Sequence, residues 1–219
     1  HIHRHGTPGP LALSGDNTFA LAHGKTGGGG LAPLVAAATL PGRDGSKGGR
    51  AMIYGHTAYV FSSDNGDNNR LIKNCLKWFE QLLSTDVMVL VYARGEAVAQ
   101  MIRSFGYGCE SIDDEDTFRE AIVAGAFNVV CGLTHSLKTK ETQEAMSNFL
   151  LDGGCAILTG TAWGWKQLNP GKDLTTQYPG NLVMSPFGLT WVDGYLDAIT
   201  TIGSGQDSWD AFKAVPVNN

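Results

Sequence analysis

The sequence predicts an α/β fold in which a doubly wound, mainly parallel sheet carries helices on both faces. Strand-like and helix-like patterns alternate from residue 50 to residue 160. The strand-like runs in this region are continuously apolar, as are parallel strands that are covered on both sides. This alternation requires parallel pairing through right-handed crossovers. We expect a single domain over residues 19–219, preceded by an irregular segment over residues 1–18.

The first part of this domain is expected to lead into the alternating region through short strands and glycine-rich turns. In chain order, the patterns predict a short strand at 19–22, a flexible loop at 24–30, an apolar run of small residues at 31–40, a turn at 41–49 and a strand at 50–61.

The alternating region follows with helices whose apolar residues recur at steps of three and four. We expect these helices to begin at Asp67, after residue 92, at Asp116 and at Thr139, because Asp and Thr are common N-cap residues. The intervening strands are predicted at 87–92, 109–112, 128–133 and 155–160.

The regular pattern stops after residue 160. Residues 161–181 are rich in Gly, Pro and Trp and show no periodicity, which predicts a long functional or packed loop. Short strands are expected at 182–184 and 189–192, and a final helical turn at 208–214.

Composition limits the classes of partner. The chain has 219 residues and a formal net charge of −5, with no cluster of Lys and Arg, which argues against a nucleic acid or an anionic membrane surface. No apolar run approaches the ~20 residues of a membrane span. No secretory signal is visible at the start of the sequence.

The four cysteines are predicted to be free thiols buried in the core. Cys75, Cys109, Cys131 and Cys155 form no Cys-x-x-Cys pair, so the usual zinc-ribbon and thioredoxin spacings are absent. This usage favours a reducing compartment or a secreted protein that does not depend on disulfides, and the localisation stays open.

Ligands of open parallel sheets bind beyond the carboxyl ends of the strands, so these ends contain the candidate site residues. They include His56, His135 and a hydroxyl-rich turn after residue 159, although ordinary turn chemistry explains such residues equally well. A hydrolase that uses Cys131 with His135 or His56 is an alternative. It is weakened because Cys131 follows two valines in strand register and is expected to point into the core.

Metal chemistry has little support in the sequence. No His-Glu-x-x-His motif occurs, and no cofactor is predicted. A free α-amine with His1 and His3 can hold Cu(II) or Ni(II) in a square-planar nitrogen set, whereas a disordered terminus explains the same residues.

Residues 128–195 resemble a domain shared by the TRP-channel-associated factors of animals and the enhancin-like, mucin-degrading zinc metallopeptidases of bacteria. The most specific motifs are Trp163-Gly164-Trp165, Asn169-Pro170-Gly171 and Tyr178-Pro179-Gly180-Asn181. With GGRAMIYGHTAYVF upstream, the resemblance extends over residues 48–196.

The resemblance implies a fold like that of the class I glutamine amidotransferases, which are flavodoxin-like. In those enzymes a cysteine occupies the turn after the strand that corresponds to residues 155–160, where this sequence has Thr159, Gly160 and Thr161. A threonine without an adjacent base is a poor nucleophile. The resemblance therefore implies a non-catalytic accessory or recognition domain.

The expected partner is a glycan, as in the mucin-degrading relatives, or a protein, as in the channel-associated ones. Indole faces offer rigid contact area for either partner. The metallopeptidase branch would imply secretion, although free cysteines suit the cytoplasm as well. The candidate binding residues are Trp163, Trp165, Asn169, Tyr178, Asn181, His56 and His135.

Overall fold

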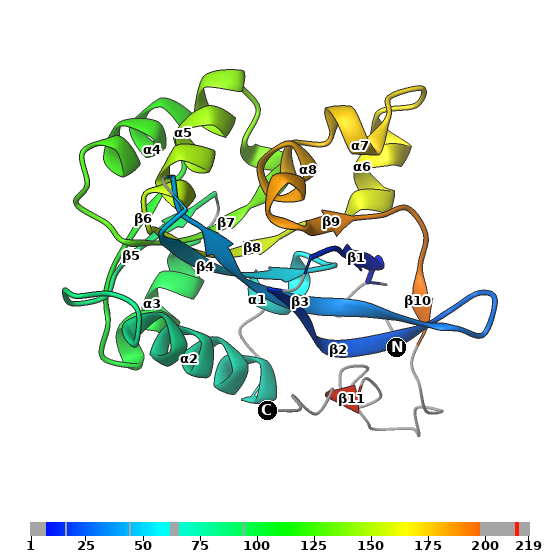
Figure 1. Cartoon of the computed structure of the whole chain (residues 1–219), viewed down its shortest axis with the longest axis horizontal. Helices are drawn as coiled ribbons and strands as arrows, with labels where there is room; N and C mark the ends of the chain where they lie inside the picture. Colours follow the sequence, from blue (N-terminus) through cyan, green and yellow to red (C-terminus); the bar gives the residue numbers. More distant parts are fainter. Residues whose placement is uncertain are drawn as a thin grey trace.

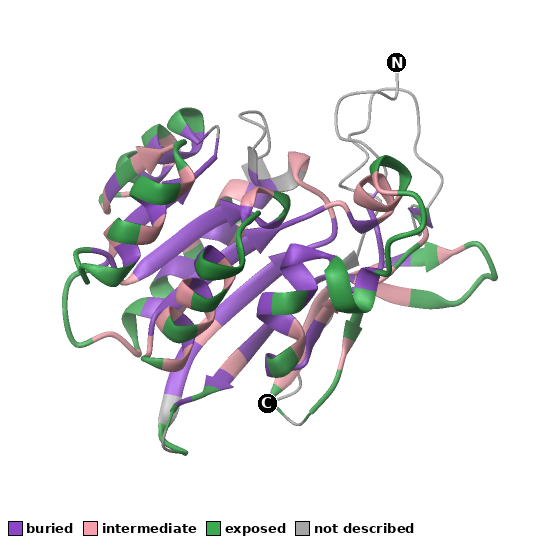
Figure 2. Ribbon diagram, turned by 90° about the horizontal axis from the view of Figure 1, so that it is seen from above, coloured by how far each residue is buried: buried purple, intermediate pink, exposed green. Residues whose placement is uncertain are grey.

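The computed structural model describes residues 8–15, 17–43, 45–61, 66–93, 95–197 and 213–214. Within these ranges the chain forms a mixed sheet of nine strands with helices on both faces, and a separate ribbon of two strands (Figure 1). Figure 2 shows that the central strands are buried while the outer faces of the helices are exposed. The predicted α/β class is confirmed.

Five parallel strands form one half of the sheet, and all but the first agree with the predicted bounds within one residue. They are β4 (Lys47–Tyr54), β5 (Met88–Tyr92), β6 (Gly108–Ile112), β7 (Val129–Leu133) and β8 (Cys155–Thr159). Their order across the sheet is β4-β8-β7-β5-β6. The strand order therefore reverses beside β5, because β6 lies on one side of β5 and β7 lies on the other.

Helices cover the two faces of this half in separate groups (Figure 1). α1 (Ala58–Phe61), α2 (Gly66–Glu80) and α3 (Glu96–Ser104) lie on one face, and α4 (Glu115–Val123) and α5 (Lys140–Leu151) lie on the other. Ile72 and Ile102 belong to the core of the first face, and Phe118 and Met146 to the core of the second.

The predicted helices are present, but only one of the three predicted caps is in place. The helix predicted to be capped by Asp67 begins at Gly66, so Asp67 lies inside α2. The Thr139 side chain caps α5 and accepts a hydrogen bond from the Thr142 backbone N–H. The cap predicted at Asp116 is wrong by two residues, because the Asp114 carboxylate accepts a hydrogen bond from the Thr117 N–H at 2.8 Å. Consecutive acidic residues at 113–116 made both positions competent caps.

The other half of the main sheet is antiparallel, which corrects the expectation of a mainly parallel sheet. It consists of β2 (Thr18–Thr26), β3 (Leu31–Pro41), β10 (Leu196–Asp197) and β11 (Lys213–Ala214). β3 pairs with β2 on one side and with β4 on the other, antiparallel to both. Short connections at 27–30 and 42–46 make these hairpins possible, since parallel neighbours would need a long crossover.

Several predicted element boundaries in this half differ from the observed ones. Residues 24–26, predicted to lie in a loop, continue β2, and the strand predicted over 50–61 ends at Tyr54 before α1 begins. Within the segment predicted to be irregular, β1 (Leu11–Leu13) pairs antiparallel with β9 (Leu189–Trp191). The single domain over 19–219 stays a prediction.

The region predicted as a loop after residue 160 is short helices. The segment contains α6 (Ala162–Leu168), α7 (Leu174–Gln177), α8 (Pro179–Met184) and the 3₁₀ turn η2 (Ser185–Phe187). Another 3₁₀ turn, η1 (Thr134–Ser136), directly follows β7. The strand predicted at 182–184 is wrong, because these residues belong to α8. Of the helical turn predicted at 208–214, residues 208–212 lie outside the described ranges, and residues 213–214 form β11.

Candidate functional site

The carboxyl ends of β4, β7 and β8 meet at one end of the sheet, and the predicted residues follow them. Thr159, the last residue of β8, donates a hydrogen bond from its hydroxyl to the His56 carbonyl at 2.7 Å. The half-buried His56 ring accepts a hydrogen bond at Nδ1 from the Ala58 N–H at 3.0 Å, so it orders the start of α1. His135 lies in η1 and is exposed. The structure thus joins His56 to the β8 turn.

The turn after β8 is closed by a tyrosine. A Cβ atom at Gly160 would collide with the Tyr178 hydroxyl and with Thr134 Oγ1, so glycine is required there for space. Tyr178 is fully buried, and its hydroxyl lies 2.6 Å from Thr134 Oγ1, which in turn donates to the Thr159 carbonyl at 3.2 Å. Burial raises the pKa of Tyr178. The Tyr178 ring therefore fills the space beside the turn.

Asn181 of α8 connects α7 to β9 through hydrogen bonds of its side-chain amide. Its side-chain amide donates to the carbonyls of Leu174 at 3.0 Å and Trp191 at 2.8 Å, and its Oδ1 accepts from the Trp191 N–H at 2.8 Å. The Trp191 indole donates to the Tyr54 carbonyl at 2.8 Å. Because Asn181 is 1% exposed, it positions this segment and presents no surface to solvent.

Trp165 lies on the side of α6 that packs against the core, and Asn169 directly follows the helix. The Trp165 ring meets Tyr178 edge-on at 5.4 Å between centroids, and Lys172 Nζ lies 5.9 Å from the Trp165 ring. Asn169 donates from its side chain to the Trp165 carbonyl at 2.9 Å and ends the helix. Trp165 is half-buried, so one part of its ring stays accessible.

The half-buried Trp163 and the exposed Tyr195 form an aromatic pair that we call the aromatic corner. Their ring centroids are 5.2 Å apart, Tyr195 is 52% exposed, and the Gln167 amide donates to the Tyr195 hydroxyl at 3.2 Å. Tyr195 also borders a hollow of about 580 Å³ with Asp193 and Asp197. The sequence analysis missed Tyr195, although an aromatic residue directly after Asp-Gly in a turn signals exposure.

The thiol of Cys131 is not placed for catalysis. Cys131 lies in the middle of β7 with no exposed surface, and burial raises its pKa. His135 is exposed on the turn that follows. Burial also raises the pKa of Cys109 and of Cys155 to about 11. All four cysteines are free and buried, as predicted.

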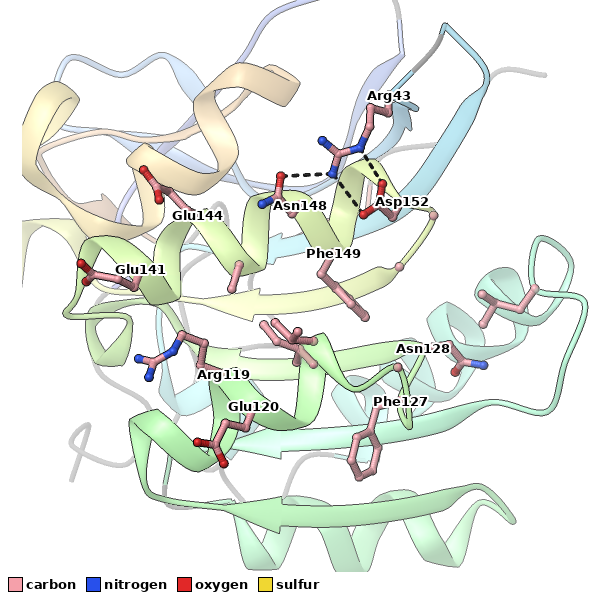
Figure 3. Close-up of a pocket in the computed structure, with 17 residues that line it drawn as sticks. Arg43, Arg119, Glu120, Phe127, Asn128, Glu141, Glu144, Asn148, Phe149 and Asp152 are labelled. Carbon is pink, nitrogen blue, oxygen red and sulfur yellow. Dashed lines mark hydrogen bonds and ion pairs between the residues drawn. The ribbon is translucent and has the colours of Figure 1, made fainter.

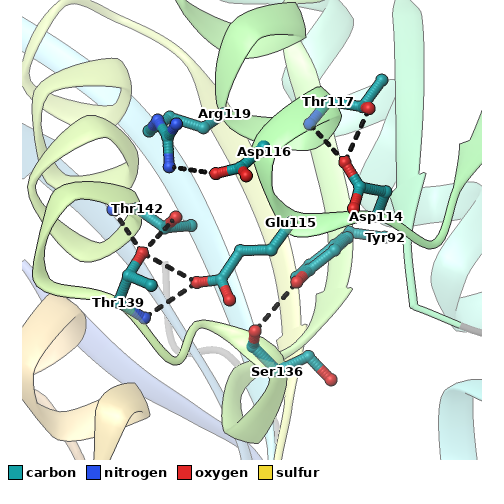
Figure 4. A network of polar contacts seen from close by, with 9 residues as sticks. All are labelled: Tyr92, Asp114, Glu115, Asp116, Thr117, Arg119, Ser136, Thr139 and Thr142. Carbon is teal, nitrogen blue, oxygen red and sulfur yellow. Dashed lines mark hydrogen bonds and ion pairs between the residues drawn. The ribbon is translucent and has the colours of Figure 1, made fainter.

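A second polar network closes the point between β5 and β7 where the chain reverses, which is where open α/β sheets usually bind ligands (Figure 4). The Tyr92 hydroxyl donates to the Ser136 carbonyl at 2.8 Å, and its ring stacks on Phe118 at 4.1 Å. Glu115 accepts hydrogen bonds from the Thr139 N–H at 2.8 Å and its hydroxyl at 3.0 Å. These side chains tie α4 to the start of α5.

The described residues contain neither a metal-binding cluster nor a membrane-spanning helix. His1 and His3 lie outside the described residues. Elsewhere in the described ranges, no group of three or more His, Cys, Asp or Glu side chains is arranged to hold a metal ion. None of the helices described is both long and apolar enough to cross a membrane.

Comparison with known proteins relates the chain to one family by sequence. Its relatives include a TRPM8 channel-associated factor homolog of Danio rerio, 25% identical over 83% of this chain, and one of Xenopus laevis, 22% identical over 66%. These matches cover 17% and 14% of the relatives, so the chain spans a small part of their length.

Solved structures give the same fold at lower sequence identity. The IMPa metallopeptidase in complex with T-antigen matches 99% of this chain and 22% of its own, with a TM-score of 0.57 at 15% identity. IMPa from Pseudomonas aeruginosa matches with a TM-score of 0.56 at 14% identity, over 97% of this chain and 22% of its own. At these identities the match shows the fold alone.

A family model named TCAF_N, described as "TRPM8, N-terminal domain", matches residues 2–201. The resemblance to the channel-associated factors is thereby confirmed, and the likeness to an amidotransferase stays a prediction. The chain belongs to the TCAF_N family of N-terminal domains.

Proposed function

We propose that the chain is a non-catalytic recognition domain that binds a glycan at the aromatic corner. The observation that carries this proposal is the contact of the half-buried Trp163 with the exposed Tyr195, beside the hollow that Asp193 and Asp197 border. Aromatic faces pack against the C–H faces of sugar rings, and carboxylates accept hydrogen bonds from sugar hydroxyls. The fold neighbour IMPa has been solved with T-antigen, which supports a glycan as the class of ligand.

A non-catalytic role is supported by the closed turn after β8. The fold is proposed to be amidotransferase-like and flavodoxin-like in its parallel half, with Gly160 near the position where those enzymes carry a cysteine. Tyr178 and Thr134 fill the space beside it. A side chain at residue 160 would collide with the Tyr178 hydroxyl, so this position has no room for a nucleophilic side chain.

The other predicted residues take supporting roles in this proposal. Tyr178 and Asn181 hold the helical segment in place, and Asn169 ends α6. Trp165, packed against Tyr178, keeps α6 oriented so that Trp163 faces Tyr195. His56 and His135 lie on the turns after β4 and β7.

A glycan array with a mucin-type set tests the ligand. We expect Trp163→Ala and Tyr195→Ala to abolish the binding that the unaltered domain shows, with little change in thermal midpoint. Leu168→Ala is the matched control, because Leu168 is on the same helix and is 85% exposed. An array on which the unaltered domain binds nothing, or on which both variants bind normally, contradicts the proposal.

A protein ligand at the same corner is the second candidate. The names of the relatives, TRPM8 channel-associated factors, favour it. Two results together would support this candidate. The unaltered domain would bind no glycan on the array, and a pull-down would capture one protein with the unaltered domain but not with Trp163→Ala or Tyr195→Ala.

The hydrolase alternative is tested with a thiol reagent. Because all four cysteines are buried, we expect the native protein to react slowly at neutral pH and all thiols to react once it is denatured. Fast, selective labelling of Cys131 in the native state would restore the alternative.

A further inference from the structure

A groove of about 870 Å³ lies between α4 and α5, away from the aromatic corner (Figure 3). Asn128 and Gly154, which directly precede β7 and β8, line its inner end, so the groove opens at the amino ends of the parallel strands. We propose that it is the docking site for a basic, amphipathic peptide segment of a partner protein. This proposal is independent of the proposed glycan site.

One end of the groove is apolar. Phe127 and Phe149 lie at this end in Figure 3, and Ile122 and Ala145 contribute from the facing helices. Val123, at the end of α4, lines the groove and is 72% exposed. Phe127 and Ile122 are buried floor residues of the groove, so its accessible apolar surface comes from Val123 and the half-buried Phe149 and Ala145. Accessible apolar surface that is rimmed by polar residues is typical of an interaction site.

The other end is acidic. Glu141 and Glu144 of α5 lie there opposite Arg119 and Glu120 of α4 (Figure 3), and Glu144 is paired with Lys140 at 3.1 Å. Within the described part of the chain, Glu120 and Glu141 have no ion-pair partner.

The cations of the groove are already engaged. Arg119 pairs with Asp116 at 2.8 Å, outside the groove lining, and Arg43 pairs with Asp152 at 2.8 Å. The remaining charge is therefore negative, and its complement is Lys or Arg.

The spacing of the two ends defines the ligand further. Glu141 and Phe149 are eight residues apart along α5, a rise of about 12 Å. A helical peptide spans this distance in about two turns, so it would carry basic residues at one end and apolar residues about two turns away.

Other occupants fit the charge less well. An anionic membrane surface would be repelled by Glu120 and Glu141. A second copy of this chain, with a formal net charge of −5, would bring like charge to the groove. A cationic segment matches the acidic end and the apolar end together.

The test uses a fluorescent 14-residue helical peptide with Lys at one end and Leu and Phe two turns away, and measures anisotropy against the whole chain. A second peptide has Glu at each Lys position and the same apolar residues. We expect the basic peptide to bind and the acidic one not to bind. Equal binding of both peptides, or no binding of either, would overturn the proposal.

Variants locate the binding. The double variant Glu120→Gln, Glu141→Gln is expected to raise the Kd of the basic peptide about fivefold, because two exposed charge pairs are lost. Val123→Ser is also expected to raise the Kd of the basic peptide. Glu110→Gln is the matched control, an exposed carboxylate on β6 outside the groove, and should leave binding unchanged. An unchanged affinity in the double variant would place the peptide elsewhere and refute the groove.

Discussion

The two ends of the parallel strands differ in how their space is used. At the carboxyl ends, where open α/β sheets usually bind ligands, Tyr178 fills the turn after β8 and Tyr92 bridges to Ser136. At the amino ends, the groove between α4 and α5 stays open. The topology therefore identifies where a site is customary, but side-chain volume decides whether the space directly at the strand ends stays open to a ligand.

The closed turn and the groove between α4 and α5 also differ in whether their polar side chains have hydrogen-bond partners within the chain. Asn181 and Thr134 at the closed end have hydrogen-bond partners within the chain. Glu120 and Glu141, which line the groove between α4 and α5, are exposed. Satisfied buried groups fix one structure, whereas solvated carboxylates leave interactions for a partner.

Among the substitutions that test this difference, Asn181→Ala is expected to lower the free energy of unfolding the most. The substitution leaves the Trp191 N–H and two buried carbonyls without their partner, which should lower the free energy of unfolding by about 3 kcal/mol. Urea denaturation measures the loss. Asn169→Ala, which removes one half-buried hydrogen bond, is the control and should cost about 1 kcal/mol. Equal losses in the two variants would show that the closed end does not depend on Asn181.

Gly160→Ala tests whether the closed turn is as tightly packed as the structure shows. The added methyl group meets the Tyr178 hydroxyl and Thr134 Oγ1, so we expect a loss of about 2 kcal/mol. Tyr178→Phe removes the hydroxyl, and the double variant should be more stable than the sum of the single losses predicts. Strict additivity in this double-mutant cycle would contradict the contact.

Asn68→Leu tests a part of the molecule where polar groups are not satisfied. Asn68, in the first turn of α2, is fully buried, and neither atom of its side-chain amide has a hydrogen-bond partner within the described structure. Replacing it with an apolar side chain of similar size removes the cost of that burial, so the free energy of unfolding should rise by about 1 kcal/mol. A lower thermal midpoint in the variant would mean that the amide is bonded in solution.

The smallest effect is expected at alkaline pH. Burial, together with Glu115, Asp114 and Asp113, raises the pKa of Tyr92 to about 12. Since tyrosine in the unfolded chain ionises near pH ~10, the contribution of Tyr92 to stability is complete below that pH and declines between about 10 and 12.

The matching variant is Tyr92→Phe, which loses the bond to Ser136 and should be about 1 kcal/mol less stable at neutral pH. We expect this difference to narrow as the pH rises from about 10 to 12, measured by urea denaturation at each pH. A constant difference would show that Tyr92 ionises at its ordinary pKa.

The parallel half was predictable because its strands and helices are long enough to show a period. The apolar run of β8 and the Thr139 cap of α5 each identify an element without knowledge of its neighbours. The antiparallel half was harder, because the small apolar residues of β3 are buried on both sides and show no alternation.

The candidate site was less predictable than the fold. α6, α7 and α8 have four to seven residues each, too short to establish a helical period, and Pro179 at the start of α8 resembled a loop residue. The burial of Tyr178 depends on Thr134, 44 residues away in the chain. Exposure of Tyr195 depends on tertiary packing as well, which a local pattern does not reveal.

The central position of β4 has a consequence for the order of assembly during synthesis. Ala51 of β4 pairs with Ala156 of β8, 105 residues later in the chain. At about 5–20 residues per second, the ribosome needs roughly 5–20 s to add that intervening length. During this interval one edge of β4 has its backbone N–H and C=O groups unpaired, and such an edge is prone to pair with other chains. The nascent domain is therefore expected to be most aggregation-prone, and most dependent on chaperones, just before β8 emerges.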